Sequence, residues 1–353
     1  MLKFLLYPFS LLYGLITDFR NVLFDKGFKS QTGFDIPIIN VGNLTVGGTG
    51  KSPQIEYLIR LLADTYQVAS LSRGYGRKTK GYILADEHAN AEQIGDEPMQ
   101  FFQKFGSKIS VVVSEKRVEG VQQLLQEKPT TELVLLDDAY QHRYINPSFN
   151  ILLMDYNRPF YEDLTFPAGR LRERRRGANR ADCIVVSKCP ESLDSKAQDT
   201  IKQQIKPYSK VGTPIFFSTI RYGNPISCIG KSDVLPTKNI LLVTGIANPL
   251  PFENYVAQQF TIQERLIFKD HHAFSEEDVA QIKQALMQEN TSEKSVLMTE
   301  KDSVKFKDLL DKNDPIASRF FYIPIEIDFL NQERDVFNNL ILAHCTKCLK
   351  TKP

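Results

Sequence analysis

The stretch that decides the fold is Asn40-Val41-Gly42-Asn43-Leu44-Thr45-Val46-Gly47-Gly48-Thr49-Gly50-Lys51-Ser52-Pro53. It lies between an apolar, strand-like run over residues 36–41 and a helix-like run over residues 54–62. A glycine-rich loop between a strand and a helix can turn its backbone N–H groups toward phosphate oxygens. Lys51 adds a positive charge for the outer phosphates, and the Ser52 hydroxyl can bind Mg²⁺. The stretch therefore predicts a P-loop, which binds a nucleoside triphosphate such as ATP or GTP.

This loop departs from the usual P-loop pattern at one position. In the pattern G-x-x-x-x-G-K-[ST], the first glycine corresponds to Thr45 of this chain. The residues expected to hold the phosphates are Thr45, Val46, Gly47, Gly48, Thr49, Gly50, Lys51 and Ser52. The alternative is a glycine-rich turn followed by Lys-Ser by chance, but the strand–loop–helix context that the motif requires is present.

A second apolar run ends in two acids. Leu133-Val134-Leu135-Leu136-Asp137-Asp138 reads as a buried strand with carboxylates at its end. Beside a P-loop, an acid at this position holds Mg²⁺ directly or through water, whereas in isolation it would be an ordinary pair of surface acids. Gln141 and His142 come just after and can line the same cleft. The expected metal ligands are Ser52, Asp137 and Asp138.

Three other polar stretches are candidates for the site. Gly95-Asp96-Glu97-Pro98 lies at a predicted helix start, where the aspartate either caps the helix or accepts a hydroxyl proton. Asp270-His271-His272 follows a strand and is either a surface pair or a catalytic group. Ser72-Arg73-Gly74-Tyr75-Gly76-Arg77 ends another strand with a basic, glycine-flexed loop that suits an anionic ligand.

The charge of the chain is unevenly distributed although its total is near zero. The formal net charge of the 353 residues is +2, which argues against bulk nucleic-acid binding. Six arginines nevertheless surround one glutamate in Arg170-Leu171-Arg172-Glu173-Arg174-Arg175-Arg176 and at Arg180. This cluster is either a solvated loop or a surface for anionic phosphates on a substrate or a lipid.

The N-terminus begins with an apolar segment. Residues 4–16 read FLLYPFSLLYGLI, which is shorter than the run of about 20 apolar residues that a bilayer span needs. Helical spacing places on one face Leu5, Phe9, Leu12, Ile16, Phe19 and Leu23. A helix of this kind either lies in a membrane surface or packs on the core of its own protein, and we expect the former.

Strand-like and helix-like runs alternate along the chain, which is typical of an α/β protein with a largely parallel sheet. We expect a membrane-associated helix over residues 1–30, a P-loop kinase domain over residues 31–210, and a C-terminal α/β domain over residues 211–353. The last of these begins with residues 215–221 and 226–229, which flank Tyr222-Gly223-Asn224-Pro225 and predict a β-hairpin linker. A final helix is expected over residues 330–343.

Several motifs occur in one order along the chain. After the apolar helix come GGTGKSP, SRGYGR, GDEP, LLDDAYQH, FPAGRLRE, GIANP, DHHAF and TEKD. Over nearly its whole length the chain therefore resembles the tetraacyldisaccharide 4′-kinases, the lipid A 4′-kinase family of Gram-negative bacteria. The resemblance implies Mg²⁺-dependent transfer of the ATP γ-phosphate to the 4′-hydroxyl of a lipid A disaccharide 1-phosphate. It also implies two P-loop-NTPase-like α/β/α domains, an inter-domain site, and a monotopic enzyme on the cytoplasmic face of the inner membrane.

The resemblance also assigns roles to residues by motif. Asp96 and His271 correspond to the catalytic pair of the family, and Lys51 to its P-loop lysine. The family usually has Thr where this chain has Ser52, a conservative change for a metal-bound hydroxyl. The residues that match motifs lining the cleft are Arg73, Arg77, Glu97, Gln141, His142, Arg172 and Glu173. The oligomeric partner and the acyl-chain preference are not predicted.

Two other function classes share the P-loop. A membrane-associated switch ATPase of the partitioning type carries a signature lysine just before its Gly-Gly pair, and Val46 occupies that position here. A nucleotide-dependent basic scaffold without chemistry is the third possibility. An assay for lipid phosphorylation separates all three.

Overall fold

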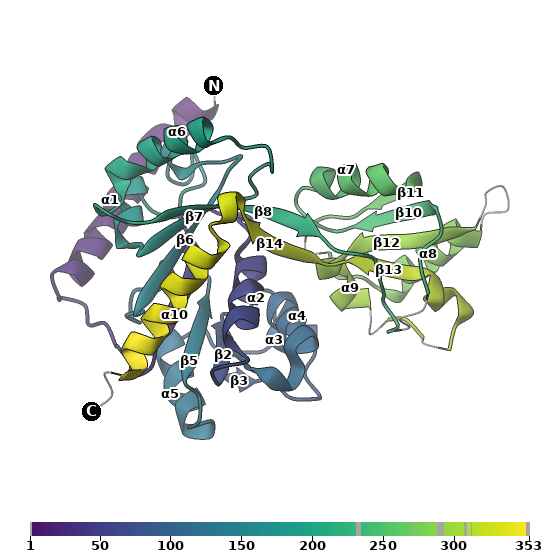
Figure 1. The fold of residues 1–353 in the computed structure, drawn as a ribbon, viewed down its shortest axis with the longest axis horizontal. Coiled ribbons are helices and arrows are strands. Elements are labelled where there is room, and N and C mark those ends of the chain that lie inside the picture. The colour runs from purple at the N-terminus through teal and green to yellow at the C-terminus, as the bar shows by residue number, and fades with distance from the viewer. Residues whose placement is uncertain are drawn as a thin grey trace. The chain divides into compact units, whose positions relative to one another are not determined.

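The computed structural model describes residues 2–230, 234–270, 272–287, 293–306, 309–311 and 313–350, which form two compact units, Met1–Ile220 with Ile327–Pro353, and Arg221–Glu326 (Figure 1). The helices are α1 (Leu2–Asp25), α2 (Lys51–Leu62), α3 (Ala91–Ile94), α4 (Asp96–Phe105), α5 (Arg117–Glu127), α6 (Ser195–Ile205), α7 (Leu250–Gln259), α8 (Glu276–Met287), α9 (Glu300–Phe306) and α10 (Arg334–Lys350). The strands are β1 (Ile38–Asn43), β2 (Val68–Ser72), β3 (Ile83–Leu84), β4 (Ser110–Val113), β5 (Leu133–Asp137), β6 (Phe149–Asp155), β7 (Cys183–Ser187), β8 (Ile215–Tyr222), β9 (Ile226–Ser227), β10 (Asn239–Thr244), β11 (Thr261–Ile267), β12 (Lys294–Thr299), β13 (Phe320–Ile323) and β14 (Ile325–Phe329).

The first unit is built on a nine-stranded sheet with the order β14-β8-β7-β6-β1-β5-β2-β4-β3. The central strands from β8 to β4 pair in parallel, and β3 runs antiparallel to β4 at the edge. The P-loop strand β1 therefore has β5, with its terminal acid, on one side and β6 on the other. Since the carboxyl ends of parallel strands share one edge, the P-loop and the acids lie together.

Side chains alternate between the two faces of this sheet, as the period of two in a strand requires. Leu133 and Leu135 of β5 pack into the core that α2 and α10 cover, and Val134 and Leu136 pack into the core under α5. Both sets of side chains are fully buried. This continuous apolar pattern is typical of parallel strands with helices on both faces, and the predicted α/β class with mainly parallel sheets is confirmed.

The second unit carries a five-stranded sheet with the order β11-β10-β12-β13-β9. Its strands β11, β10, β12 and β13 pair in parallel, and the short β9 pairs antiparallel with β13. The same alternation recurs, because Leu241 and Val243 face the core under α8 whereas Ile240 and Leu242 face α7.

The predicted hairpin linker is wrong. Strand β8 lies between β7 and β14 in the first sheet, and β9 pairs with β13 in the second. At the expected turn, the Gly223 N–H donates to the Pro324 carbonyl at 2.9 Å, so this segment pairs with a distant part of the chain. The turn residues therefore predicted that the two neighbouring strands pair with each other. In the structure each of them instead pairs with strands that are distant in the sequence.

The C-terminal helix lies in a different unit from the one expected. The predicted domain over residues 211–353 was continuous, but the chain enters the second unit at Arg221 and Ile327–Pro353 belongs to the first. Helix α10 lies beside α2, where the Tyr57 hydroxyl donates to Asn338 Oδ1 at 2.7 Å (Figure 1). Phe337 of α10 is fully buried in the same core. Burial of this apolar side chain explains why the chain returns to the first unit.

Two adjacent residues of α10 test this placement. Phe337 is 0% exposed and Val336 is 61% exposed. We expect Phe337→Ala to lower the free energy of unfolding of the first unit by about 3–5 kcal/mol, because it opens a cavity. Val336→Ala should change it by less than about 0.5 kcal/mol. Urea unfolding monitored by circular dichroism measures both, and equal midpoints for the two variants would contradict the placement of α10 in this core.

Candidate active site

The P-loop joins β1 to α2 and depends on two glycines in the left-handed region. Gly47 has φ 115°, and Gly50, the residue before the first turn of α2, has φ 84°. A side chain at either position would strain the backbone, which explains the glycines. The first N–H groups of a helix have no acceptor within it. Those of α2, starting at Lys51, therefore form an anion-binding helix terminus.

A loop from later in the chain braces the first half of the P-loop. Thr45 forms an antiparallel bridge with Leu171. The Val46 N–H donates to the Arg170 carbonyl at 2.8 Å, and the Arg172 N–H donates to the Leu44 carbonyl at 2.7 Å. Thr45 is 8% exposed, and it occupies the position of the usual first glycine. An extended, paired backbone thus replaces a free glycine turn, which explains why threonine is tolerated there.

The end of strand β7 supports the second half of the P-loop. The Ser187 hydroxyl donates to the Thr49 carbonyl at 2.8 Å, and Asn43 Nδ2 donates to Thr49 Oγ1 at 2.7 Å. The Lys188 ammonium contacts the Gly48 carbonyl and lies 2.8 Å from a carboxylate oxygen of Asp155. These contacts tie the second half of the loop to the end of β7.

The two acids at the end of β5 have different surroundings. Asp137 is 2% exposed, and its Oδ1 has no hydrogen-bond partner among the described residues. Burial raises the pKa of Asp137, and the negative charge of Glu97 adds to this rise. A buried, unpartnered carboxylate oxygen at this edge is suited to accept a metal ion, a metal-bound water or a proton.

Asp138 connects the P-loop lysine to the arginine cluster. Arg172 Nη1 lies 2.8 and 2.9 Å from the two carboxylate oxygens, and Lys51 Nζ lies 3.7 Å from Oδ1. Burial acts to raise the pKa of Asp138, but the positive charges of Lys51 and Arg172 outweigh it and the pKa is lowered. Asp138 is therefore ionised at neutral pH and orients both cations.

These residues fit a Mg²⁺–triphosphate complex. Ser52 follows Lys51 in the first turn of α2, and the side chains at the end of β5 are hard oxygen donors. No group of three or more His, Cys, Asp or Glu side chains in the described part of the chain is arranged to hold a metal alone. Mg²⁺ bound to a nucleotide needs only one or two protein ligands, because phosphates and waters complete its shell.

Gln141 and Glu173 lie behind this site rather than at its surface. Gln141 Nε2 donates to the Asn43 carbonyl at 2.9 Å and to Glu173 Oε1 at 3.0 Å. Glu173 is 2% exposed and accepts two hydrogen bonds from Arg180 at 2.7 and 2.9 Å. The pair thus links the start of the P-loop to the loop that braces it.

Comparisons with known proteins agree with this geometry. The family model described as tetraacyldisaccharide-1-P 4′-kinase matches residues 2–346. The chain belongs to this family. It is 44% identical to the tetraacyldisaccharide 4′-kinase of Flavobacterium johnsoniae, over 99% of both chains, and 42% identical to that of Bacteroides thetaiotaomicron, over 96% of this chain and 92% of the relative.

A solved structure of the family is also similar. The crystal structure described as the "apo" form of LpxK from Aquifex aeolicus in complex with ATP superposes with a TM-score of 0.75 at 30% identity. The match covers 98% of this chain and 99% of the other. The predicted family resemblance is thereby confirmed.

The remaining members of the predicted set are placed as follows. Asp96 is the first residue of α4 and follows Gly95, whose φ is 94°, and the charge of Glu97 acts on Asp137. His271 lies outside the described residues. Its neighbour His272 bonds to Asp278 at 3.0 Å and stacks on Phe268, so the second histidine of this motif has a packing role.

The two arginines of the glycine-flexed loop differ in exposure. Arg73 is exposed just beyond β2, and its positive charge acts on Arg117 and His142. The Arg77 side chain is 2% exposed and pairs with Glu115 at 2.5 Å. Arg73 is therefore accessible to an anion at the edge of the sheet, whereas Arg77 stabilises the loop through its ion pair with Glu115.

Two residues near the site were missed by the sequence analysis. Arg117, the first residue of α5, is 3% exposed and lies within the electrostatic reach of Asp137 and Asp138. Burial lowers its pKa to about 10, and the two acids oppose this change. Lys188 directly follows β7. Both are basic residues just past a buried strand of the same sheet, which is the signal that would have found them.

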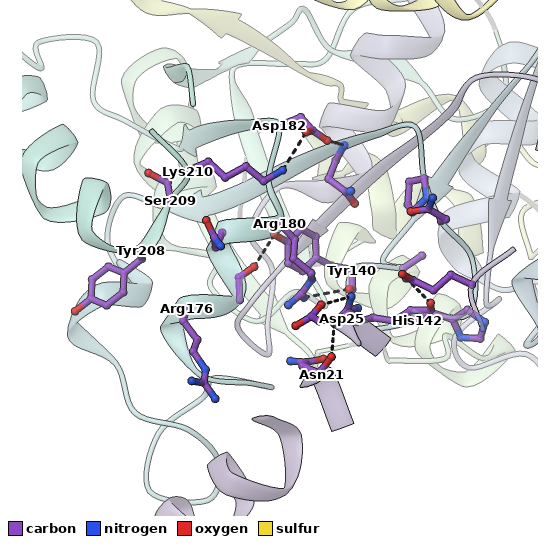
Figure 2. A pocket seen from close by; sticks show the side chains of 18 of the residues that line it. Asn21, Asp25, Tyr140, His142, Arg176, Arg180, Asp182, Tyr208, Ser209 and Lys210 are labelled. Atoms are coloured by element: carbon purple, nitrogen blue, oxygen red, sulfur yellow. Dashed lines mark hydrogen bonds and ion pairs between the residues drawn. The ribbon is translucent and has the colours of Figure 1, made fainter. Parts of the chain in front are cut away.

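A polar cavity of about 800 Å³ lies beside α1, as Figure 2 shows. Its lining comes from α1, from the chain between β5 and β6, and from residues 176–182 and 207–210, and includes no residue of the P-loop. The cations in it face acids, as in Arg143–Asp25 at 2.7 Å and Lys210–Asp182 at 3.6 Å (Figure 2). An anionic ligand would have to displace these partners, so we assign no ligand to it.

The protonation of His142 is a testable property of the site. Burial lowers the pKa of His142 from 6.5 to about 4, and the charges of Arg117, Arg20 and Arg73 add to this. The unfolded chain binds the proton more tightly between these values, so the contribution of His142 to stability falls as the pH drops from about 6.5 to about 4. NMR titration of the imidazole, assigned by comparison with His142→Gln, should give the low value, and a pKa near 6.5 would contradict this environment.

Proposed function

We propose that the protein transfers the γ-phosphate of ATP to the 4′-hydroxyl of tetraacyldisaccharide 1-phosphate, a step in the biosynthesis of lipid A. The observation that carries the proposal is the arrangement of Lys51 at the start of α2, 3.7 Å from Asp138 at the end of the neighbouring strand. Phosphoryl transfer depends on the positioning of the reactants and on stabilisation of charge. The edge of the sheet where Lys51 and Asp138 lie carries both positive and negative side chains. The relatives carry the name of this activity over almost the full length of the chain.

In this proposal the P-loop residues 45–52 hold the triphosphate. Lys51 stabilises the negative charge that develops on the transferred phosphoryl group. Ser52, Asp137 and Asp138 would hold Mg²⁺, which would neutralise part of the phosphate charge. Arg73, Arg117 and Arg172 add positive charge at the same edge, and burial, together with the charge of Glu97, raises the pKa of the Asp137 carboxyl.

Asp96 and His271 act as the base in the proposed reaction. A hydroxyl is a weak nucleophile, and a carboxylate paired with an imidazole can accept its proton as its oxygen bonds to the γ-phosphorus, while the bond from that phosphorus to the bridging oxygen breaks and ADP leaves. Asp96 stands at the start of α4 behind the left-handed Gly95, in the same unit as the P-loop. The pairing with His271 rests on the family resemblance.

The outer surface of α1 supports a location at the membrane. Its large exposed side chains include Leu5, Phe9, Leu12, Ile16 and Phe19, each 57–69% exposed, whereas Ser10 and Asp18 face inward and are buried. A surface helix of a soluble protein has the opposite arrangement. None of the helices that the structure describes has the length and apolarity needed to cross a bilayer. We propose a monotopic protein on the cytoplasmic face of the inner membrane, where ATP and lipid meet.

A switch ATPase is not favoured as the alternative. Val46 stands at the place of its signature lysine, and its backbone is paired with Arg170. In a switch ATPase the lysine at this position has to reach a phosphate of the nucleotide. In this chain the backbone at the same position is paired with the loop that braces the P-loop.

The direct test of the kinase activity is a product assay. The protein, Mg-ATP and tetraacyldisaccharide 1-phosphate should give a product heavier by one phosphate on the distal sugar. Lys51→Ala should lower the rate at least about 100-fold, since the developing charge loses its partner. Lys196→Ala, which removes an exposed lysine of α6, serves as the control and should retain the rate. Hydrolysis of ATP with no phosphorylated lipid would point to the switch ATPase.

The proposed catalytic pair predicts a non-additive double variant. Asp96→Ala and His271→Ala should each lower kcat by about 10²–10⁴-fold, and the double variant should cost little more than the worse single change. His88→Ala, at an exposed histidine of the first unit, is the control. Losses that multiply, or an unchanged rate in His271→Ala, would falsify the pair.

The apolar face of α1 predicts the behaviour of the protein with vesicles. Leu12→Ser, Ile16→Ser and Phe19→Ser in one chain should shift it from phospholipid vesicles to the supernatant on sedimentation, because each buried apolar side chain contributes about 1.5–3 kcal/mol. Changing the exposed apolar residues Val211 and Leu250 to serine should leave the binding unchanged. If both variants bind vesicles alike at high salt, the membrane surface lies elsewhere.

A further inference from the structure

The inner face of α1 is joined to the rest of its unit by polar contacts. The Tyr13 hydroxyl donates to the Arg172 carbonyl at 3.0 Å, and Asn21 Nδ2 donates to Glu173 Oε2 at 2.8 Å. Arg20 donates to the Gln141 carbonyl at 2.8 Å. The helix also approaches closely at Gly14, where a Cβ would lie 2.6 Å from the Arg174 side chain. The acceptors of all three hydrogen bonds are residues 141, 172 and 173.

Two of these three residues bond directly to the backbone that leads into the P-loop, and Glu173 reaches it through Gln141. The Arg172 N–H bonds to the Leu44 carbonyl at 2.7 Å, and its guanidinium holds Asp138. Gln141 Nε2 bonds to the Asn43 carbonyl at 2.9 Å. Arg172 therefore connects α1 to the Leu44 carbonyl, and the Glu173–Gln141 pair connects it to the Asn43 carbonyl.

We infer that Tyr13 and Asn21 are positioning residues for the nucleotide site, so that α1 forms part of the kinase site as well as the proposed membrane surface. They act through Arg172 and Glu173, and neither contacts the nucleotide. The inference rests on the proposed assignment of residues 45–52 to the triphosphate.

Burial explains why these contacts matter. Glu173 is 2% exposed, so a donor that is lost is not replaced by bulk water. Asn21 and Arg180 share the Oε2 atom, and without Asn21 the carboxylate is drawn toward Arg180 and away from Gln141. Loss of one such bond changes an equilibrium by about two- to tenfold. The change is expected in ATP affinity, because the P-loop backbone is at the end of the route.

The test compares three variants on one helix. Asn21→Leu keeps the size of the side chain without its donor, and Tyr13→Phe removes one oxygen and leaves the packing intact. Thr17→Ala is the matched control, since its hydroxyl donates to the Gly14 carbonyl within α1 itself. Each full-length protein is titrated with Mg-ATP by calorimetry, assayed for the KM of both substrates, and sedimented with phospholipid vesicles.

We expect Asn21→Leu and Tyr13→Phe to raise the Kd and KM for ATP by about two- to tenfold, with the KM for the lipid and vesicle binding unchanged. Thr17→Ala should match the unmodified protein. The inference is overturned if Tyr13→Phe and Asn21→Leu bind ATP as tightly as Thr17→Ala. Lys51→Ala in the same titration separates failure of this inference from failure of the P-loop assignment. If Lys51→Ala still binds ATP, the P-loop assignment itself is refuted.

Discussion

The buried carboxylate of Glu173 is the constraint on which the site depends. It accepts hydrogen bonds from Arg180, Asn21 and Gln141 while only 2% exposed. A charge in this position is stable only while its donors stay in place. The carboxylate therefore fixes three segments at once: α1, the arginine-rich loop, and the chain just after β5. The arginine-rich loop and the chain after β5 contact the P-loop and its preceding residues directly, so the shape of the P-loop depends on contacts far away in the sequence.

This constraint also separates the roles of the acids and cations at the strand edge. Arg172 directly precedes Glu173 in the arginine-rich loop, and it engages both oxygens of Asp138. Asp138 is thereby kept ionised and committed to Arg172 and Lys51, whereas Asp137 keeps a buried oxygen that has no hydrogen-bond partner in the described part of the chain. Four arginines of the cluster form ion pairs within the protein: Arg172 with Asp138, Arg180 with Glu173, and Arg174 and Arg176 with Asp18 of α1. Most of the positive charges of the cluster are therefore paired with carboxylates of the same chain.

The parts of the fold that follow from local pattern were predictable. Strand β5 begins at Leu133 as expected because an apolar run there ends in two acids, and the P-loop and these acids were recognised from residue type and spacing. The pairing of Thr45 with Leu171 could not be predicted, since an irregular loop carries no period. Two other contacts could not be predicted for a related reason, because their partners are distant in the sequence. They are the packing of Phe337 on the first unit and the pairing of Gly223 with Pro324. Arg117 and Lys188 were missed although their places after buried strands identify them.

The most direct measurement is hydrogen exchange in a Glu173→Gln variant, which keeps the size of the side chain and removes its charge. If the carboxylate links α1 to the P-loop, peptides covering residues 5–25 and 43–58 should both exchange faster, by about tenfold, because charge-assisted bonds are lost from both. Peptides from β12 in the second unit should exchange as in the unmodified protein. Faster exchange in α1 with an unchanged rate at residues 43–58 would contradict the account.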